Sequence, residues 1–158
     1  MKKIWIVLLL PFIFASSAYA FNLKNTIKFG SGFVCGLLAH EAAHLAVLYV
    51  NDIEYDKINF DHGMTIYWDG KPSKTVALAG FTEQIISTEI ILHKKLYKNS
   101  PFWGGYLTFN IIQPVITITN NNNDLNEFSL AGGNKTIVGI TINLHSLYTL
   151  YRIINKSS

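Results

Sequence analysis

The sequence predicts a mainly α-helical, membrane-embedded bundle of about four helices, with a β-hairpin inserted after the first helix. Three observations support this fold class. Hydrophobic residues make up 49% of the 158-residue chain, and charged residues only 15%. Four apolar segments of roughly 17–21 residues alternate with polar connectors, and a helix needs ~20 residues to cross a hydrocarbon core. One connector instead alternates apolar and polar residues, which is typical of strands.

Composition also excludes several classes of protein. The formal net charge of +3 is small and scattered, so nucleic acid is not expected as a partner. The mean hydropathy of +0.24 is high for a soluble domain but modest for a membrane protein with many spans. Cys35 is the only cysteine, which excludes an internal disulfide and any cysteine-based zinc site.

The first 20 residues have the pattern of an export signal. Lys2 and Lys3 precede an apolar run over residues 4–14, and Ala18-Tyr19-Ala20 provides a cleavage site of the small-x-small type. We therefore predict a signal peptide over residues 1–20 and a single membrane-embedded domain over residues 21–158. The alternative is an uncleaved anchor helix, although the apolar run is short for a membrane span.

Each predicted helix after the first follows a stretch containing Pro or Gly, the residues that most often end helices or form turns. The four helices are expected over residues 30–50, 75–92, 102–118 and 136–154. Between the first two, residues 58–68 alternate apolar and polar side chains on both sides of Asp61-His62-Gly63. This alternation around a glycine-containing turn predicts the β-hairpin.

The motif His40-Glu41-Ala42-Ala43-His44 lies within the apolar stretch of the first predicted helix. Residues i and i+4 share one helix face, so His40 and His44 can direct ring nitrogens at a common point. Neutral imidazoles suit Zn²⁺, which at catalytic sites takes a third protein ligand and leaves a position open for water. Glu41 is then placed to accept a proton from that water as it attacks a carbonyl. This is the HExxH pattern of zinc peptidases, and a structural cluster of hydrogen-bonded side chains is the alternative.

The residues alone leave the third ligand open. Glu83 belongs to a polar stripe with Gln84 and further hydroxyl side chains, which is interpreted more simply as polarity that orients the ligands than as a ligand itself. Asp124 lies in the connector before the fourth predicted helix, from where a loop could fold it onto the histidines. The other candidates are Glu89 and His145.

The order of these elements resembles the core of the site-2 protease family of intramembrane zinc peptidases. In that family a transmembrane helix carries HExxH, a β-structured insertion follows, and a later segment supplies an aspartate as third ligand. The resemblance implies that His40, His44 and Asp124 bind Zn²⁺ and that Glu41 is the general base. The family usually has glycine directly after this aspartate, whereas this chain has Leu125.

Three classes of function therefore stay open. The first is a membrane zinc metallopeptidase, expected in a bacterial inner membrane. The second is a soluble, exported, gluzincin-like zinc peptidase with Glu83 or Glu89 as ligand, and the third is a non-catalytic membrane protein with a structural His/Glu cluster. The expected partners of the first class are the lipid bilayer, a peptide or membrane-protein substrate and an unidentified protein partner. Connector charges and a cleaved signal predict opposite orientations in the membrane, so the topology also stays open.

Overall fold

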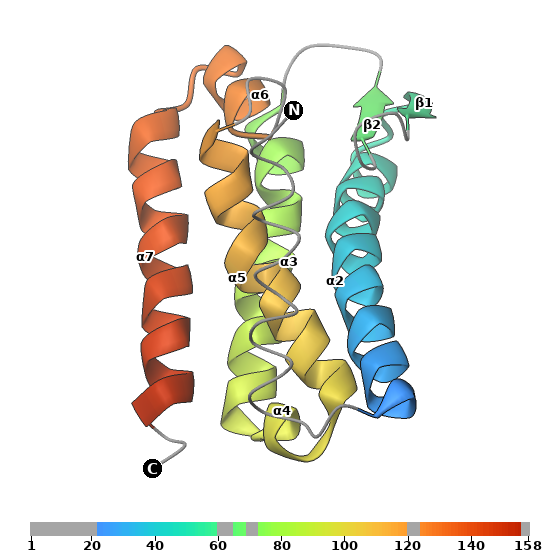
Figure 1. The fold of residues 1–158 in the computed structure, drawn as a ribbon. Helices are drawn as coiled ribbons and strands as arrows, with labels where there is room; N and C mark the ends of the chain where they lie inside the picture. The colour runs from blue at the N-terminus through green and yellow to red at the C-terminus, as the bar shows by residue number, and fades with distance from the viewer. Residues whose placement is uncertain (1–21, 60–64, 69–72, 120–123, 156–158) are drawn as a thin grey trace.

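The computed structural model describes residues 22–59, 65–68, 73–119 and 124–155. Over these residues the protein is mainly helical, as predicted, and four long helices stand side by side with alternating chain directions (Figure 1). They are α2 (Leu23–Val50), α3 (Lys74–His93), α5 (Pro101–Thr119) and α7 (Lys135–Asn155). The predicted signal peptide lies outside the described residues.

The shorter elements lie at the two ends of this bundle. Helix α4 (Leu96–Asn99) connects α3 to α5 at one end (Figure 1). Helix α6 (Asp124–Leu130) and the strands β1 (Tyr55–Asn59) and β2 (Thr65–Trp68) lie at the other end. The HExxH motif lies in the half of α2 that is nearer to α6 and the strands.

Helix α2 begins at Leu23, earlier than the predicted start at residue 30. Asn22 caps the helix, because its side-chain oxygen accepts a hydrogen bond from the backbone N–H of Lys24 at 2.9 Å. The first turns of α2 carry Lys24 and Lys28. These charged residues interrupt the apolar run, so an apolar run alone predicts a later start. The helix nevertheless includes them, because Asn22 caps it and lysine is a good helix former.

The two strands pair antiparallel, with Ile58 opposite Ile66. Ile66 is buried against Leu48 of α2 and Val76 of α3, so this pair covers the junction between those two helices. The predicted turn at Asp61-His62-Gly63 lies outside the described residues. Of the predicted hairpin, the structure therefore describes the two paired strands.

The connector before α7 was expected to be a loop but contains the short helix α6. Helix α6 buries Leu125 and Phe128, which are three positions apart and so share one face. Asp124 and Glu127 lie in its first turn, where carboxylates favour helix formation. Leu125 joins a buried cluster with Phe81 of α3 and Ile142 of α7, and this packing fixes the position of Asp124.

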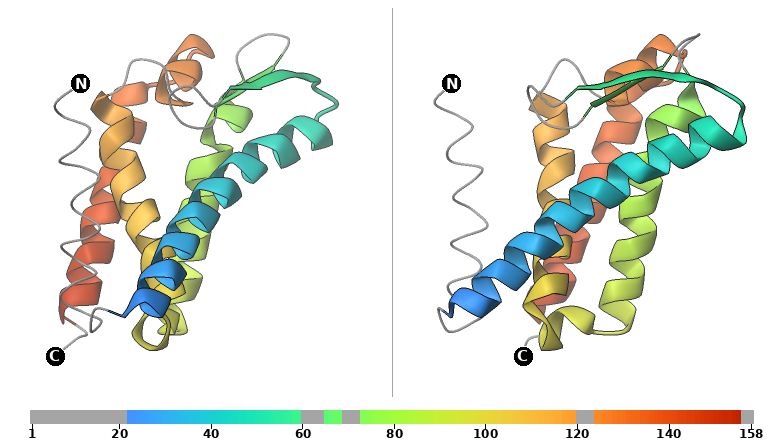
Figure 2. Two further views of the ribbon diagram at one scale, coloured as in Figure 1. Left: turned by 45° about the vertical axis from the view of Figure 1, so that its right-hand side comes forward. Right: turned by 90° about the vertical axis from the view of Figure 1, so that its right-hand side faces the viewer.

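Helix α2 leans across the bundle, so that its first half lies on α5 and its second half approaches α3 (Figure 2). The contact with α5 is made backbone to backbone. A side chain at Gly32 would overlap the carbonyl of Phe102, and one at Gly105 would overlap the carbonyl of Phe29. Small residues at both crossing points let the two helices approach closely, as is common between helices in membranes.

This contact predicts opposite effects for two nearby glycines of α2. Gly32→Ala should lower the thermal midpoint of the purified protein, because overpacking of this kind typically costs about 1–3 kcal/mol. Gly30→Ala is the matched control, since a Cβ at Gly30 meets nothing within 4 Å. Alanine there should stabilise the helix by about 0.5–1 kcal/mol. Equal midpoints for the two variants would contradict the described α2–α5 contact.

Candidate metal centre

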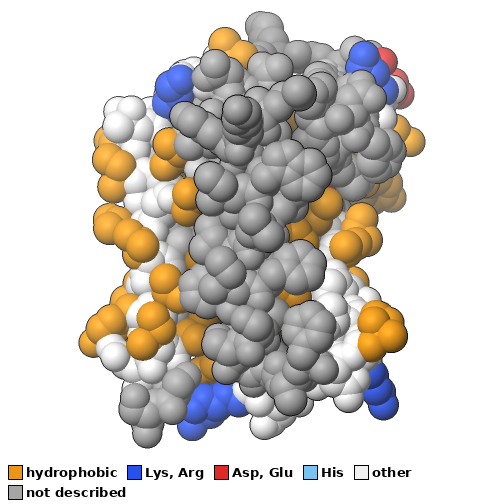
Figure 3. All heavy atoms as spheres, viewed as in Figure 1, with side chains coloured by type: hydrophobic (Ala, Val, Ile, Leu, Met, Phe, Trp, Pro, Cys, Tyr) orange, Lys and Arg blue, Asp and Glu red, His pale blue; other side chains and the backbone are white. Residues whose placement is uncertain are grey.

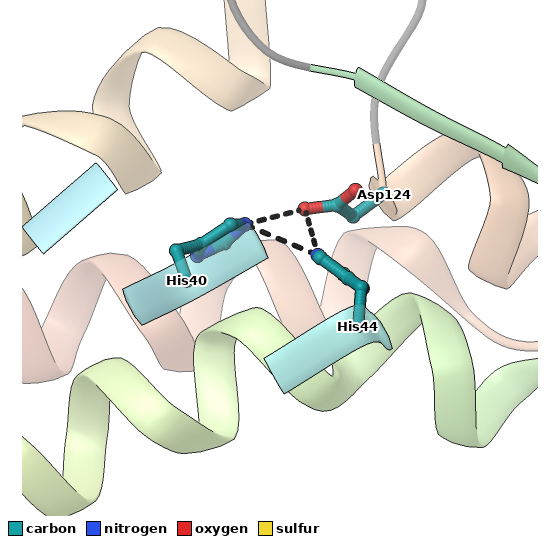
Figure 4. A group of neighbouring side chains, drawn as sticks. All are labelled: His40, His44 and Asp124. Carbon is teal, nitrogen blue, oxygen red and sulfur yellow. Dashed lines mark hydrogen bonds and ion pairs between the residues drawn. The ribbon is translucent and has the colours of Figure 1, made fainter. Parts of the chain in front are cut away.

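Three predicted ligands meet between the second half of α2 and the start of α6. Nε2 of His40 lies 3.1 Å from Oδ2 of Asp124 and 3.3 Å from Nε2 of His44. Nε2 of His44 lies 3.5 Å from the same Asp124 oxygen. Figure 4 shows the three side chains pointing at one another. Together they form a group that could hold a metal ion.

The orientation of His44 is fixed by the backbone of α3. Its Nδ1 donates a hydrogen bond to the carbonyl oxygen of Val76 at 2.7 Å. A carbonyl only accepts, so the Nδ1 of His44 carries the proton and a neutral ring presents a bare lone pair at Nε2. That lone pair faces Asp124, whose oxygen is also an acceptor. Two facing acceptors require a cation between them, either a shared proton or a metal ion.

The His40 ring is held by close packing on three sides. A Cβ at Gly80 of α3 would overlap Cε1 and both nitrogens of the ring, which lies with its face on α3. Phe81 and Phe109 contact the ring edge-to-face, with centroid distances of 5.6 and 6.2 Å. His40 is only 2% exposed. Nε2 is thereby directed at Asp124, while Nδ1 is buried with no hydrogen-bond partner among the described residues.

Asp124 closes the site from the end of the bundle. Its side chain is 27% exposed, so Asp124 is the residue of the group that solvent reaches, whereas His40 and His44 are buried. Burial of the carboxyl group acts to raise the pKa of Asp124, but the neighbouring His40 and His44 outweigh this effect and hold the pKa well below its ordinary value. Asp124 is therefore ionised at neutral pH, which is the form that binds a cation.

Glu41 lies on α2 directly after His40 and is almost fully buried, with 7% of its surface exposed. A buried carboxylate normally has hydrogen-bond or charge partners, because its desolvation is costly. Its position three residues before His44 makes the two side chains neighbours on the surface of α2, so Glu41 lies beside the group. The sequence predicted it to be a base rather than a ligand, and it is not among the three converging residues.

The other ligand candidates have partners away from this group. Glu83 accepts a hydrogen bond from the Tyr106 hydroxyl at 2.7 Å, which joins α3 to α5. Glu89 accepts two hydrogen bonds of 2.7 Å from Arg152 and contacts His145 at 3.3 Å, which joins α3 to α7. The structure therefore brings Asp124 to the histidines and places Glu83, Glu89 and His145 elsewhere.

Sequence reasoning missed two groups that support the site, namely the Val76 carbonyl and Gly80. A backbone carbonyl leaves no signal in the sequence. Gly80 did leave one, because a glycine in the middle of an apolar helix costs roughly 0.5–1 kcal/mol relative to alanine and therefore often marks a close approach.

Fold and site together define a mainly helical protein with a buried His-His-Asp group that could hold a metal ion. No family model, no curated protein and no solved structure matches the chain. Any further assignment therefore depends on the chemistry of the residues themselves.

The packing of His40 against α3 gives a test of the site. Gly80→Ala should weaken metal binding at least tenfold, because its methyl group has to displace the His40 ring. Binding can be measured by competition with a chromophoric chelator in detergent. Gly30→Ala, which changes the same residue type in open space, should bind like the wild type. Unchanged affinity in Gly80→Ala would show that His40 is not a ligand in this rotamer.

Proposed function

We propose that this protein is a membrane zinc metallopeptidase similar in its catalytic core to site-2 proteases. The observation that carries the proposal is the convergence of His40, His44 and Asp124 from two elements far apart in the sequence, with Glu41 buried beside them. Two imidazoles and one carboxylate are the ligand set of a catalytic zinc site, which uses three protein ligands and an open fourth position.

The spacing of the three atoms supports zinc. Zinc binds nitrogen and oxygen at ~2.0–2.2 Å in tetrahedral geometry, so its ligand atoms lie about 3.3–3.5 Å apart. The three distances in the group are 3.1, 3.3 and 3.5 Å. These residues therefore fit a zinc ion with little movement. Asp124 is the partly exposed residue of the group, so a water ligand would reach the ion from its side.

The proposed chemistry divides between the ion and the chain. When bound, zinc would supply a Lewis acid that lowers the pKa of a coordinated water towards neutrality. Glu41 would accept the proton of the attacking water and pass it to the leaving amine. His44 is held in the ligand tautomer by Val76, and the packing around His40 fixes the direction of its Nε2.

The helix surfaces support a membrane location. Among the described helices, α2, α3 and α7 are long and apolar enough to cross a bilayer. Large apolar side chains are exposed along α7, where water would be an unfavourable neighbour. Figure 3 shows hydrophobic side chains along both sides of one face, and Lys and Arg near its two ends. The exposed apolar residues of α7 are Ile137, Ile140, Leu144, Leu147, Tyr148, Tyr151 and Ile154.

The two ends of the bundle differ in charge, which supports one orientation. The end that carries α4 has Lys24, Lys28, Lys94, Lys95, Lys98 and Arg152. The opposite end has only three lysines among the described residues, Lys57, Lys74 and Lys135, and it also carries the acidic residues Asp52, Glu54, Asp56, Asp124 and Glu127. Under the positive-inside rule the α4 end is cytoplasmic, an orientation that goes with the uncleaved anchor rather than with a cleaved signal peptide. The His-His-Asp group would then open towards the outer side of the membrane.

The role of Glu41 can be separated from metal binding. Glu41→Gln should keep stoichiometric zinc but lower peptidase activity about 100-fold or more, because only the proton acceptor is lost. His40→Ala is the contrasting variant and should lose zinc together with activity. Wild-type cleavage of a peptide substrate by Glu41→Gln would exclude Glu41 as the base.

The third ligand can be tested with two alanine variants. Asp124→Ala should lose bound zinc, since only two protein ligands remain. Glu83→Ala should retain zinc, because Glu83 bonds Tyr106 on a different part of α3. Metal content of the purified proteins by mass spectrometry decides between them. Retention in the first variant and loss in the second would favour the soluble, glutamate-ligand class of peptidase.

The orientation predicts which end of the bundle is accessible from outside. In a Cys35→Ser background, Glu54→Cys should react with a membrane-impermeant maleimide in intact spheroplasts of a bacterial host. Lys94→Cys should react only after the membrane is permeabilised, because it lies at the opposite end. The reverse labelling pattern would refute the orientation. Reaction of both positions, with release of the protein by alkaline carbonate, would refute the membrane location.

A further inference from the structure

The two histidines of the candidate metal centre are supported unequally. A histidine that binds metal through Nε2 carries its proton on Nδ1, and that N–H almost always has an acceptor that fixes the ring. His44 has the carbonyl of Val76 at 2.7 Å. Nδ1 of His40 is buried and has no partner among the described residues. Figure 4 shows this second ring nitrogen turned away from Asp124. The site is therefore one acceptor short.

Gln84 of α3 is an unused acceptor in the same part of the bundle. Its side chain is buried, with 3% of the residue exposed. Neither its Oε1 nor its Nε2 has a hydrogen-bond partner within the described part of the chain. A buried amide with both ends unpaired is unusual in a folded protein and calls for an explanation. Gln84 also lines a small pocket between α3, α5 and α7, with Asn110 and Thr149 on its other walls.

Helix geometry places Gln84 beside the His40 ring. A Cβ at Gly80 would be almost equally close to Cε1, Nε2 and Nδ1 of His40, so the ring lies with its face on α3 at this position. Gln84 is four residues further along α3, so it occupies the same helix face one turn away. Side chains on a helix lean towards its N-terminus, which for Gln84 is the direction of Gly80. The amide of Gln84 therefore lies on the face of α3 that the His40 ring covers, one helical turn from Gly80.

We propose that Gln84 is a positioning residue for the metal centre, whose Oε1 accepts the Nδ1 proton of His40 directly or through one water. This inference rests on the proposed zinc site. Gln84 does not touch the metal in this assignment. It fixes the tautomer and the tilt of His40, as Val76 does for His44, and the amide nitrogen is left to bond groups of the pocket.

A half-buried glutamine on α5 provides a comparison. Gln113 of α5 follows Phe109 by one turn, and Phe109 also packs on His40. Oε1 of Gln113 is buried without a partner among the described residues. Gln84 is the better acceptor because both nitrogens of the His40 ring lie over Gly80 of α3, whereas α5 presents the Phe109 ring at 6.2 Å between centroids.

The test is the zinc dissociation constant of the full chain in detergent, measured by competition with a chelator of known affinity. Gln84→Met keeps the length of the side chain but removes the acceptor, and should weaken binding about 10- to 100-fold. Gln84→Glu restores an acceptor at the same reach and should bind within about threefold of the wild type. Gln113→Met should also bind like the wild type. Gln84→Asn keeps the polarity but shortens the reach, so it should weaken binding as methionine does.

The outcomes separate this inference from the proposed function. Circular dichroism checks that each variant keeps its helices. If Gln84→Met does not fold, Gln84→Asn still tests the role of Gln84. Wild-type affinity in both Gln84→Met and Gln84→Asn would overturn the role of Gln84 while leaving the zinc site intact. Equal losses in Gln84→Met and Gln84→Glu, or a loss in Gln113→Met alone, would also overturn it. No zinc binding by the wild type would refute the proposed function itself.

Discussion

The packing of the His40 ring onto Gly80 is the contact on which the rest of the site depends. It is possible only because α3 has no side chain at that position and because α2 leans towards α3 in its second half. The lean in turn requires the glycine contacts that hold the first half of α2 against α5. Helix packing that has no chemical role thus sets the direction in which Nε2 of His40 points.

The sequence predicted the long helices well because their signal is local. Apolar runs and the breaker residues between them place α3, α5 and α7 within about two residues of their observed ends. The start of α2 was wrong because a polar first turn capped by Asn22 is still helical. Helix α6 was missed because its apolar side, Leu125 and Phe128, is too short to distinguish from a loop.

The residues of the candidate metal centre differ in how far the sequence predicts them. His40 and His44 belong to one helix, so their spacing alone brings them together. Asp124 is separated from His40 by 84 positions, and no periodicity relates the two. The family resemblance and the position of Asp124 in a connector predict it as the third ligand. The structure places Asp124 beside both histidines. The Val76 carbonyl and Gly80 lie beside the two histidines because of the way α3 packs against α2. No single residue in the sequence indicates that packing.

The separation between His40 and Asp124 also has a consequence for biosynthesis. The two histidines emerge early from the ribosome, but the carboxylate that completes the group follows only after α3 and α5 have been made. A nascent or truncated chain therefore carries the HExxH motif without the means to complete the site. For a protein with the proposed activity, the order of synthesis would itself delay the onset of proteolysis until the bundle is nearly assembled.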